Sequence, residues 1–154
     1  MAAGEPRPSG FWRIVLVFFV DNAPRPLMQL LRRRDPSFPI EELVVVGRRT
    51  GRERRILLGL HEVDGRWYVG HPNGDANWVS NLVAAGECVV IRRGHEPVRV
   101  SALELPRGPE RDAAIDATTR LPDPSGFVFR QANSHIRAVG RYFRLTPIQP
   151  PANV

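Results

Sequence analysis

The pattern of apolar positions changes near residue 40. Before that point, the run from Phe11 to Val20 is almost wholly apolar, interrupted by Arg13 and ended by Asp21. It has about half the length of a bilayer-spanning helix, and the residues after it match a signal-peptide cleavage site poorly, so a signal peptide is a minor alternative. We therefore expect residues 1–40 to form a helical segment that packs on the rest of the domain or, less favoured, rests on a membrane surface.

From residue 41 onward, short apolar runs alternate with glycines and charged turns, which is typical of a β-barrel or sandwich. The pair Asp64-Gly65 predicts a tight hairpin, because a type I′ turn needs positive φ at both central positions. The pair Gly94-His95 predicts a second hairpin. The expected strands cover residues 43–46, 55–63, 66–70, 87–92, 97–105 and 141–145.

Helices are expected outside these strands. One of about three turns should run between the two hairpins to Ala85, with Asp75 as its N-cap and Gly86 just after its end. A second helix is expected over 109–119, whereas the pattern over 127–139 is ambiguous. Parallel strands would need a crossover helix between most pairs, so this order of elements favours a small barrel, mainly β with flanking helices (α+β).

The length and composition indicate a single domain. A chain of 154 residues, 42% of them hydrophobic, can bury one core of ordinary size. We divide it into the N-terminal helical segment, a barrel over 41–148 and a tail over 149–154. The only cysteine, Cys88, excludes an intramolecular disulfide and a four-cysteine metal site; it is expected to be a small buried hydrophobe and suits a reducing, cytoplasmic location. The four histidines lack metal-binding spacing, so no metal is expected.

The basic residues point to anionic ligands. All 22 Lys and Arg positions are arginine and the net charge is +6, and a guanidinium is suited to phosphate, carboxylate or acidic lipid. A coding bias towards arginine would explain the composition equally well, and the scatter of the arginines makes nucleic acid an unfavoured partner. Their densest stretch is GRRTGRERR over 47–55, where backbone amides of a glycine turn could approach an anion. An exposed turn with solvated arginines is the alternative.

A family resemblance rests on this turn and on the residues that come after it. The turn GRRTG over 47–51 is followed by Arg54, then by a hairpin, Gly74 and a helix with the pattern Trp78-x-x-Asn81-Leu82. In this order and spacing, over about residues 43–105, the chain resembles the deazaflavin-dependent nitroreductase family of flavin/deazaflavin oxidoreductases. The resemblance implies a split β-barrel of the FMN-binding, pyridoxamine-phosphate-oxidase-like type.

The same resemblance implies a cofactor site. The cofactor would be an 8-hydroxy-5-deazaflavin coenzyme of the F-420 type, although FMN and FAD also combine a phosphate with a planar ring. The residues expected to hold the phosphate are Arg48, Arg49, Thr50 and Arg54. Those expected to line the ring and complete the site are Arg55, Ile56, Leu57, Gly74, Asn77, Trp78 and Asn81. Trp78 and Asn81 could equally serve the core and its backbone groups.

The implied activity is hydride transfer from the reduced coenzyme to an electron-poor acceptor, such as a quinone, a nitroaromatic or an activated alkene, with the cofactor carrying the chemistry. A quinone dissolved in a bilayer would give the apolar N-terminal segment a role at the membrane surface. Dimerisation, common among related barrels, is left open. These expectations describe an oxidoreductase of the nitroreductase or quinone-reductase kind.

The chain departs from the family pattern where the proton donor is expected. The loop after the third strand carries His71 in place of the usual basic residue, and Phe127 and Phe129 stand where the family often places tyrosines. The remaining candidates for catalysis are His71 and His135, with Ser134 or water as further proton sources. A split barrel that binds a ligand or flavin without catalysis is therefore the alternative function.

Overall fold

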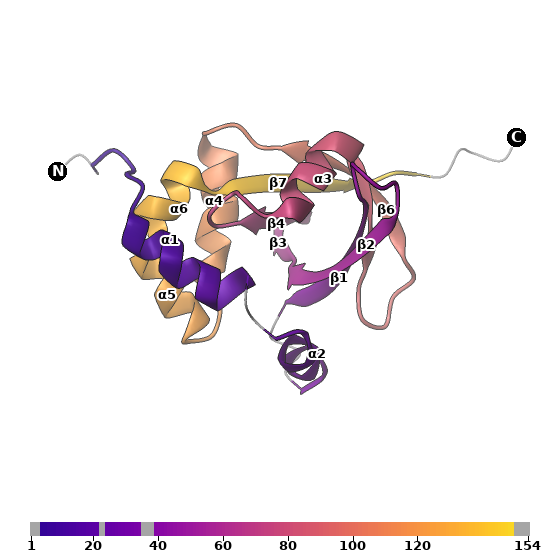
Figure 1. Ribbon diagram of the computed structural model, residues 1–154, viewed down its shortest axis with the longest axis horizontal. Helices are drawn as coiled ribbons and strands as arrows, with labels where there is room; N and C mark the ends of the chain where they lie inside the picture. The colour runs from indigo at the N-terminus through magenta and orange to yellow at the C-terminus, as the bar shows by residue number, and fades with distance from the viewer. Residues whose placement is uncertain (1–3, 22–23, 35–38, 150–154) are drawn as a thin grey trace, which may run out of the picture.

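The computed structural model describes residues 4–21, 24–34 and 39–149, so positions 150–154 of the predicted tail lie outside the described residues. The core is a seven-stranded antiparallel sheet with the strand order β2-β1-β5-β6-β7-β4-β3 (Figure 1). Its strands are β1 (Ile40–Val46), β2 (Glu53–Gly59), β3 (His61–Val63), β4 (Arg66–His71), β5 (Glu87–Ile91), β6 (Val98–Glu104) and β7 (Arg141–Pro147).

The sheet closes on itself at Leu60. β2 and β3 stand at opposite edges of the sheet, yet only Leu60 separates them along the chain. The amide of this buried residue donates to the carbonyl of Pro39 at 2.8 Å, and the chain bends here between two separate strands, which joins the two edges of the sheet. The single strand predicted over 55–63 is therefore wrong, because the chain bends here to close the barrel. The predicted split β-barrel is confirmed.

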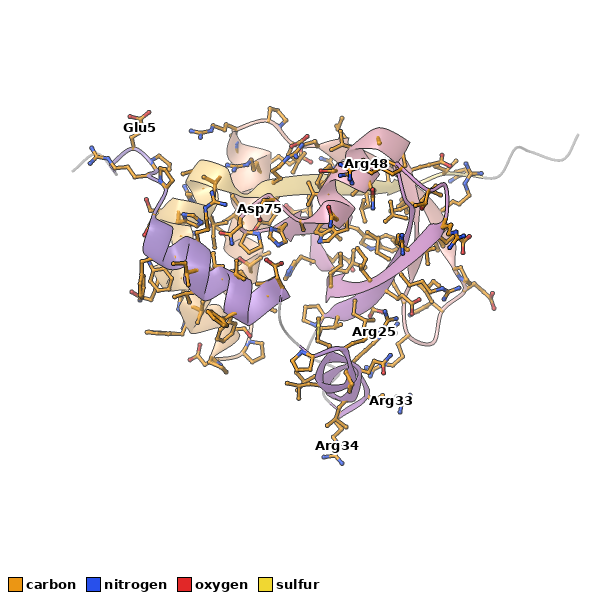
Figure 2. The ribbon with its side chains drawn as sticks, in the orientation of Figure 1. Glu5, Arg25, Arg33, Arg34, Arg48 and Asp75 are labelled. Carbon is orange, nitrogen blue, oxygen red and sulfur yellow. The ribbon has the colours of Figure 1, made fainter. Side chains whose placement is uncertain are left out.

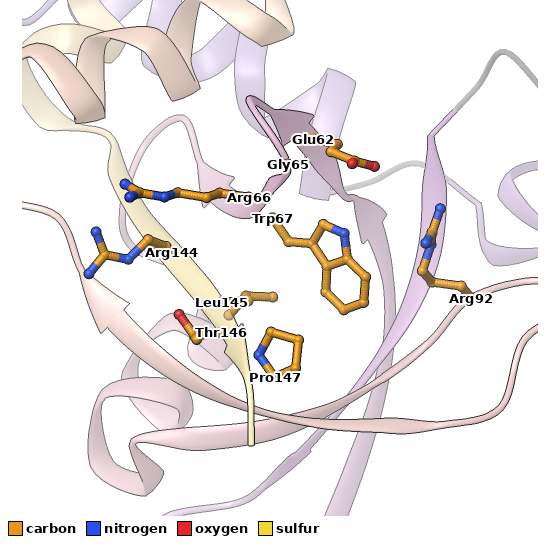
Figure 3. Close-up of a pocket in the computed structure, with 9 residues that line it drawn as sticks. All are labelled: Glu62, Gly65, Arg66, Trp67, Arg92, Arg144, Leu145, Thr146 and Pro147. Carbon is orange, nitrogen blue, oxygen red and sulfur yellow. The ribbon is translucent and has the colours of Figure 1, made fainter. Parts of the chain in front are cut away.

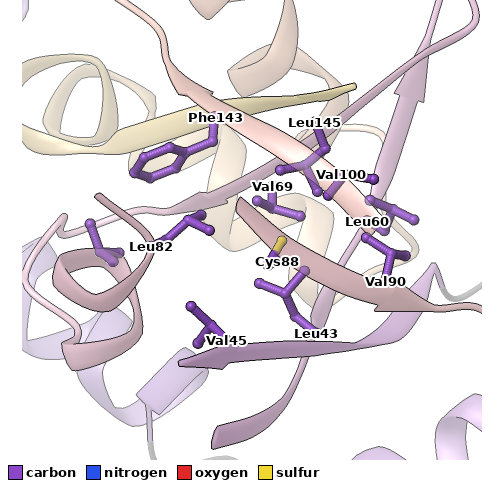
Figure 4. Close-up of a cluster of buried hydrophobic side chains, with 11 residues drawn as sticks. Leu43, Val45, Leu60, Val69, Leu82, Cys88, Val90, Val100, Phe143 and Leu145 are labelled. Carbon is purple, nitrogen blue, oxygen red and sulfur yellow. The ribbon is translucent and has the colours of Figure 1, made fainter. Parts of the chain in front are cut away.

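The barrel interior is filled by side chains from β1, β4, β5, β6 and β7, together with Leu60 and two residues of a helix. Its buried side chains are Leu43, Val45, Leu60, Val69, Val79, Leu82, Cys88, Val90, Val100, Phe143 and Leu145 (Figure 4). Val79 and Leu82 come from helix α3 (Asn77–Ala85), which closes one end of the barrel. Cys88 is buried, as predicted, and burial raises the pKa of its thiol to about 12, so the thiol stays protonated and unreactive.

A second apolar cluster lies outside the barrel, between its wall and the helices. Tyr68 and Tyr142 point outward from β4 and β7 and pack with Leu16 and Ile136. The covering helices are α1 (Gly10–Leu16), α4 (Pro109–Thr118), α5 (Ser125–Gln131) and α6 (Asn133–Val139), which group at one side of the barrel (Figure 1). The ambiguous stretch 127–139 is thus helical, with a break near Ala132 between α5 and α6.

The N-terminal segment combines packing with exposure. α1 continues as a π-helical turn, η1 (Val17–Asp21), and α2 (Arg25–Arg34) lies beside β1 and β2. Leu16 is fully buried, whereas Phe11 and Phe18 are 67% and 71% exposed. Among the described helices, none has by itself the length and apolar character of a membrane span; 10–21 and 25–34 reach both only together, with a bend of 69° between them.

The structure confirms the two predicted hairpin turns and contradicts the predicted N-cap of α3. Asp64 and Gly65 adopt φ of 52° and 77°, and Gly94 adopts 76°, so both hairpins form as expected. Gly86 ends α3 with φ of 69°. Asp75, however, is not the N-cap of α3: Ala76 occupies that position without a side-chain cap, because the Asp75 carboxylate binds Arg13 instead.

Candidate functional site

The arginine-rich turn forms a tight loop between β1 and β2. The amide of Gly47 donates to the carbonyl of Arg52 at 2.8 Å, and the amide of Gly51 donates to the carbonyl of Gly47 at 2.9 Å. A Cβ on Gly47 would lie 3.0 Å from Thr50 Oγ1 and 3.7 Å from Arg54 Nε. Glycine at position 47 therefore allows the Thr50 and Arg54 side chains to gather over the turn.

Helix α3 holds this turn through Asn81. The buried Asn81 side chain accepts from the Arg48 amide at 3.1 Å and from its guanidinium at 2.8 Å. The same guanidinium donates to the carbonyl of Asn77 at 3.4 Å. Arg48 consequently lies over α3 (Figure 2), so the predicted residues Arg48, Asn77 and Asn81 are brought together.

The turn carries positive charge that ion pairs leave uncompensated. Within the described ranges, the arginines 48, 49, 52 and 54 form no ion pair, and all four are exposed. Arginines without carboxylate partners, beside a glycine turn, can donate charge-assisted hydrogen bonds to a phosphate. The donor set thus fits the phosphate group of a flavin-type cofactor.

Trp78 provides an aromatic wall near the same end of the barrel. Its half-buried ring lies 6.4 Å from the ring of Phe143 and 6.3 Å from the ring of His71, measured between centroids. It packs against the barrel core. Trp78 therefore serves the core, as one of the two sequence-based interpretations expects, and it lies on the same helix as Asn81, which holds the turn.

The strand β2 divides the residues predicted to line the ring. Successive residues of a strand point to opposite faces, and Ile56 packs against the barrel core. Arg55 and Leu57 consequently point outward, where the Arg55 guanidinium donates to Glu42 at 2.9 Å and its carbonyl accepts from Arg25. These three side chains do not share one surface.

Gly74 also lies apart from the turn. Its φ is 73°, and a Cβ on it would lie 2.5 Å from the carbonyl oxygen of Val139. Its amide donates to the carbonyl and to Nδ1 of His71. The close approach to Val139 requires glycine here, and it gives Gly74 a packing role between the loop 71–75 and the end of α6.

Both candidate catalytic histidines are buried and hydrogen-bonded at both ring nitrogens. His71 Nδ1 accepts from the Gly74 amide, and its Nε2 lies 2.6 Å from an Asp21 carboxylate oxygen. His135 Nδ1 accepts from the Ser9 amide at 2.9 Å, and its Nε2 lies 2.8 Å from Asn73 Oδ1. Since each Nδ1 accepts a hydrogen bond, each Nε2 carries the proton and donates it.

These contacts anchor the N-terminal segment to the barrel. Asn73 donates to the carbonyl of Arg13, and Asp75 accepts from the Arg13 guanidinium, both at 3.0 Å. Burial, reinforced by the charge of Arg13, lowers the pKa of His135 below its ordinary value, so this ring is neutral at pH 7. Sequence reasoning missed the roles of Ser9, Arg13, Asp21, Asn73 and Asp75; the polar loop 71–75 was the only local signal.

Three oxygen and nitrogen ligands also meet here: Asp21, His71 and Asp75 each offer an atom within 4.8 Å of the others. The His71 lone pair at Nδ1 is already engaged by the Gly74 amide, and Asp75 is engaged by Arg13. This cluster is therefore explained as an anchor for η1 and α1.

No protein-family model and no curated protein matches the sequence. Solved structures match the fold. A protein of unknown function from Agrobacterium tumefaciens is 14% identical over 82% of this chain, with a TM-score of 0.53, and the chain spans 55% of its length. An F420-H2 dependent reductase (FDR-A) is 21% identical over 70% of this chain and 94% of its own, with a TM-score of 0.55. The heme storage protein HutZ from Vibrio cholerae is 13% identical over 82% of this chain and 91% of its own, with a TM-score of 0.50.

At these identities the likeness shows the fold alone. The split barrel of this chain is shared by proteins with different roles, among them a reductase and a heme storage protein. The fold by itself therefore does not assign a ligand or an activity, and function must be argued from the residues of this chain.

Proposed function

We propose that the chain is a deazaflavin-dependent oxidoreductase of the nitroreductase or quinone-reductase kind. The observation that supports this most is the turn 47–54: its arginines form no ion pair among the described residues, and Asn81 holds one of them, Arg48, in place. When bound, the 8-hydroxy-5-deazaflavin coenzyme supplies a hydride for an electron-poor acceptor such as a quinone, a nitroaromatic or an activated alkene. FMN and FAD are the alternative cofactors.

The residues of the turn would bind and orient the cofactor. Arg48, Arg49, Thr50 and Arg54 would donate to its phosphate, and Asn81 would hold Arg48 in position before the ligand arrives, which reduces the ordering cost of binding. Trp78 and Asn77 would border the ring and exclude water from one side of it. Because the Ile56 side chain packs into the filled barrel core, only the outward face of β2, with Arg55 and Leu57, can contribute to a ring site here.

A fluorescence titration tests the cofactor assignment. We expect the wild type to bind the deazaflavin coenzyme in preference to FMN and FAD, and Arg48→Ala with Arg54→Ala to weaken this binding at least about a hundredfold, because two charge-assisted contacts are lost. Arg93→Ala with Arg120→Ala removes the same charge from exposed positions elsewhere and should change affinity less than about threefold. Equal losses in both double variants, or no binding of any cofactor at micromolar concentration, would remove the proposal.

The second candidate is a barrel that binds a cofactor without catalysis. It is favoured by the histidines: His71 and His135 are committed to anchoring the N-terminal segment, so neither offers a free proton to a substrate. Single-turnover assays with the reduced coenzyme and menadione or a nitroaromatic distinguish the two. Oxidation of the bound coenzyme only in the presence of acceptor supports the enzyme, and binding without oxidation supports the module.

We also propose that the protein works in the cytoplasm with its N-terminal segment on a membrane surface. Phe11, Ile14 and Phe18 are exposed at helical spacing, and Arg33 and Arg34 project from α2 away from the barrel (Figure 2), where they could meet anionic headgroups. Phe11→Ser with Phe18→Ser should abolish flotation with vesicles of phosphatidylcholine and phosphatidylglycerol. Val83→Ser with Leu103→Ser, which alters exposed apolar residues elsewhere, should not. Flotation unchanged in both would exclude the idea.

A homodimer belongs to the same proposal. Val46 and Val83 are about half exposed, at 47% and 49%, on the two elements that flank the turn. A second copy could cover them and complete the site from outside. Light scattering after size exclusion should give twice the mass of the chain, and a monomer at micromolar concentration would contradict a dimer.

A further inference from the structure

The end of the barrel opposite α3 is open and contains a cavity of about 590 Å³. It is assembled from the hairpin β3–β4, the end of β7 and the residue after β5. Its lining residues are Glu62, Gly65, Arg66, Trp67, Arg92, Arg144, Leu145, Thr146 and Pro147 (Figure 3). The volume lies in the range of small-molecule sites. We call this end of the barrel the mouth.

The mouth is separate from the arginine-rich turn. The turn begins after Val46, the last residue of β1, whereas Arg92 of the cavity follows Ile91, which pairs with Glu42 four residues earlier on β1. Four residues of a strand span about 13 Å. A ligand of the mouth would therefore occupy a second site and not the proposed cofactor site.

The floor of the mouth is apolar and flat. Trp67 packs on its inner side against the barrel core, and Leu145, its cross-strand neighbour, is buried. Pro147 stands beside them, so the rings of Trp67 and Pro147 both face the same space (Figure 3). An aromatic ring of a ligand could stack on this floor, as aromatic side chains stack on one another.

The rim of the mouth carries three arginines, which differ in their partners. Arg144 donates to the two Glu110 oxygens at 2.8 and 3.1 Å, and Arg66 lies 3.6 Å from the same carboxylate. Arg92 instead lies over the Trp67 ring, with its guanidinium carbon 5.3 Å from the ring centroid. Among the described residues it has no carboxylate within ion-pair distance.

The acidic side of the rim does not cancel this charge. Glu62 is the single carboxylate in the described lining, against three guanidinium groups, and Glu110 is shared between two of them and the Tyr68 hydroxyl. An uncompensated guanidinium above an aromatic floor combines a flat apolar contact with a fixed cation. Charge complementarity therefore selects a planar ligand with a negative group.

We propose that the mouth binds a planar aromatic anion, which stacks on Trp67 and places its anionic group against Arg92. The site goes beyond the oxidoreductase proposed above, because it uses none of the residues of the turn. Arg92 would move from the Trp67 face to the edge of the ligand ring, exchanging a cation–π contact for a charge-assisted hydrogen bond. Thr146 and Arg144 would border the ligand on the β7 side.

The test uses 1-naphthoate as the probe and 1-naphthamide, its uncharged counterpart, as the matched ligand. The full-length protein is labelled with ¹⁵N, and the indole N–H signal of Trp67 is identified by its loss in Trp67→Phe. We expect 1-naphthoate to shift this signal and 1-naphthamide to bind at least about tenfold more weakly, since a charge-assisted contact is absent. Arg92→Gln should weaken 1-naphthoate by about tenfold, and Arg93→Gln, the neighbouring exposed arginine, by less than about twofold.

Three results would overturn the proposal. The first is equal affinity of Arg92→Gln and Arg93→Gln, which would mean that Arg92 only covers Trp67. The second is equal affinity for 1-naphthoate and 1-naphthamide. The third is the absence of any Trp67 shift at millimolar probe while the thermal unfolding of the protein is normal. Because these signals come from the mouth, they are independent of whether the turn binds a deazaflavin.

Discussion

The two ends of the barrel use arginine in different ways. At the α3 end, Arg48 is held by amide and carbonyl groups, and the turn around it forms no ion pair among the described residues. At the mouth, Arg144 and Arg66 meet the Glu110 carboxylate, which also accepts a hydrogen bond from the Tyr68 hydroxyl. Arginine is thus available to a ligand at the α3 end, whereas at the mouth two of the three arginines are engaged in ion pairs within the protein. The partner of an arginine decides its role.

The ends also differ in packing. α3 inserts Val79 and Leu82 into the barrel, and both are fully buried. The mouth has no covering helix among the described elements, and its Trp67 is only half-buried. The closed end therefore contributes more to stability, whereas the open end has room for a ligand. Substitutions at the two ends can test this contrast.

The largest effect is expected from opening the closed end. Leu82→Ala removes a fully buried side chain from the barrel core and should lower the free energy of unfolding by about 2–5 kcal/mol. Pro147→Ala at the mouth should cost less than about 1 kcal/mol, because its position is exposed. Urea denaturation of both variants measures the difference. Similar losses in both would show that the two ends are equally packed.

The pH dependence of stability tests a histidine on β3, the strand that contributes Glu62 to the mouth. Burial lowers the pKa of His61, on β3, from 6.5 to about 4. As the pH falls below 6.5 the unfolded chain takes up a proton that folded His61 refuses, so stability is lost between pH 6.5 and about 4, by at most about 3 kcal/mol. His61→Gln should remove this component. The difference in free energy of unfolding between wild type and variant, measured against pH, should slope only in that window, and a flat difference would contradict it.

Features that depend on neighbouring residues could be predicted from the sequence, whereas contacts between residues far apart along the chain could not. Asp64-Gly65 and Gly94 specify their hairpins because positive φ is a local requirement. Strand alternation would also have shown that residues 55, 56 and 57 cannot all face one ring. The anchor of His135 to Ser9 joins residues 126 positions apart, and the mouth draws on β3, β4, β5 and β7. Neither leaves a pattern along the chain, because both arise when the barrel closes.

A smaller effect is expected where α3 holds the turn. Asn81→Ala removes the acceptor of two Arg48 hydrogen bonds and should cost about 1–2 kcal/mol of stability. It should also weaken coenzyme binding, since Arg48 loses its fixed position. Asn77→Ala is the control, because only its backbone carbonyl accepts from Arg48. Thermal unfolding should separate the two variants, and an equal change would mean that Asn81 does not hold the turn.

The smallest effect is expected at the rim of the mouth. Arg66 lies 3.6 Å from Glu110, its side chain is 61% exposed, and Arg144 already neutralises that carboxylate at shorter distance. Solvent screens such a pair, so Arg66→Gln should change the free energy of unfolding by less than about 0.5 kcal/mol. The hydrogen bond from the Tyr68 hydroxyl and the two from Arg144 keep the pKa of Glu110 low. Arg144→Gln should cost more than Arg66→Gln, because it removes the two Arg144 bonds. If Arg66→Gln proved the more damaging, Glu110 would depend mainly on Arg66, and the shorter contacts of Arg144 would not be what holds it.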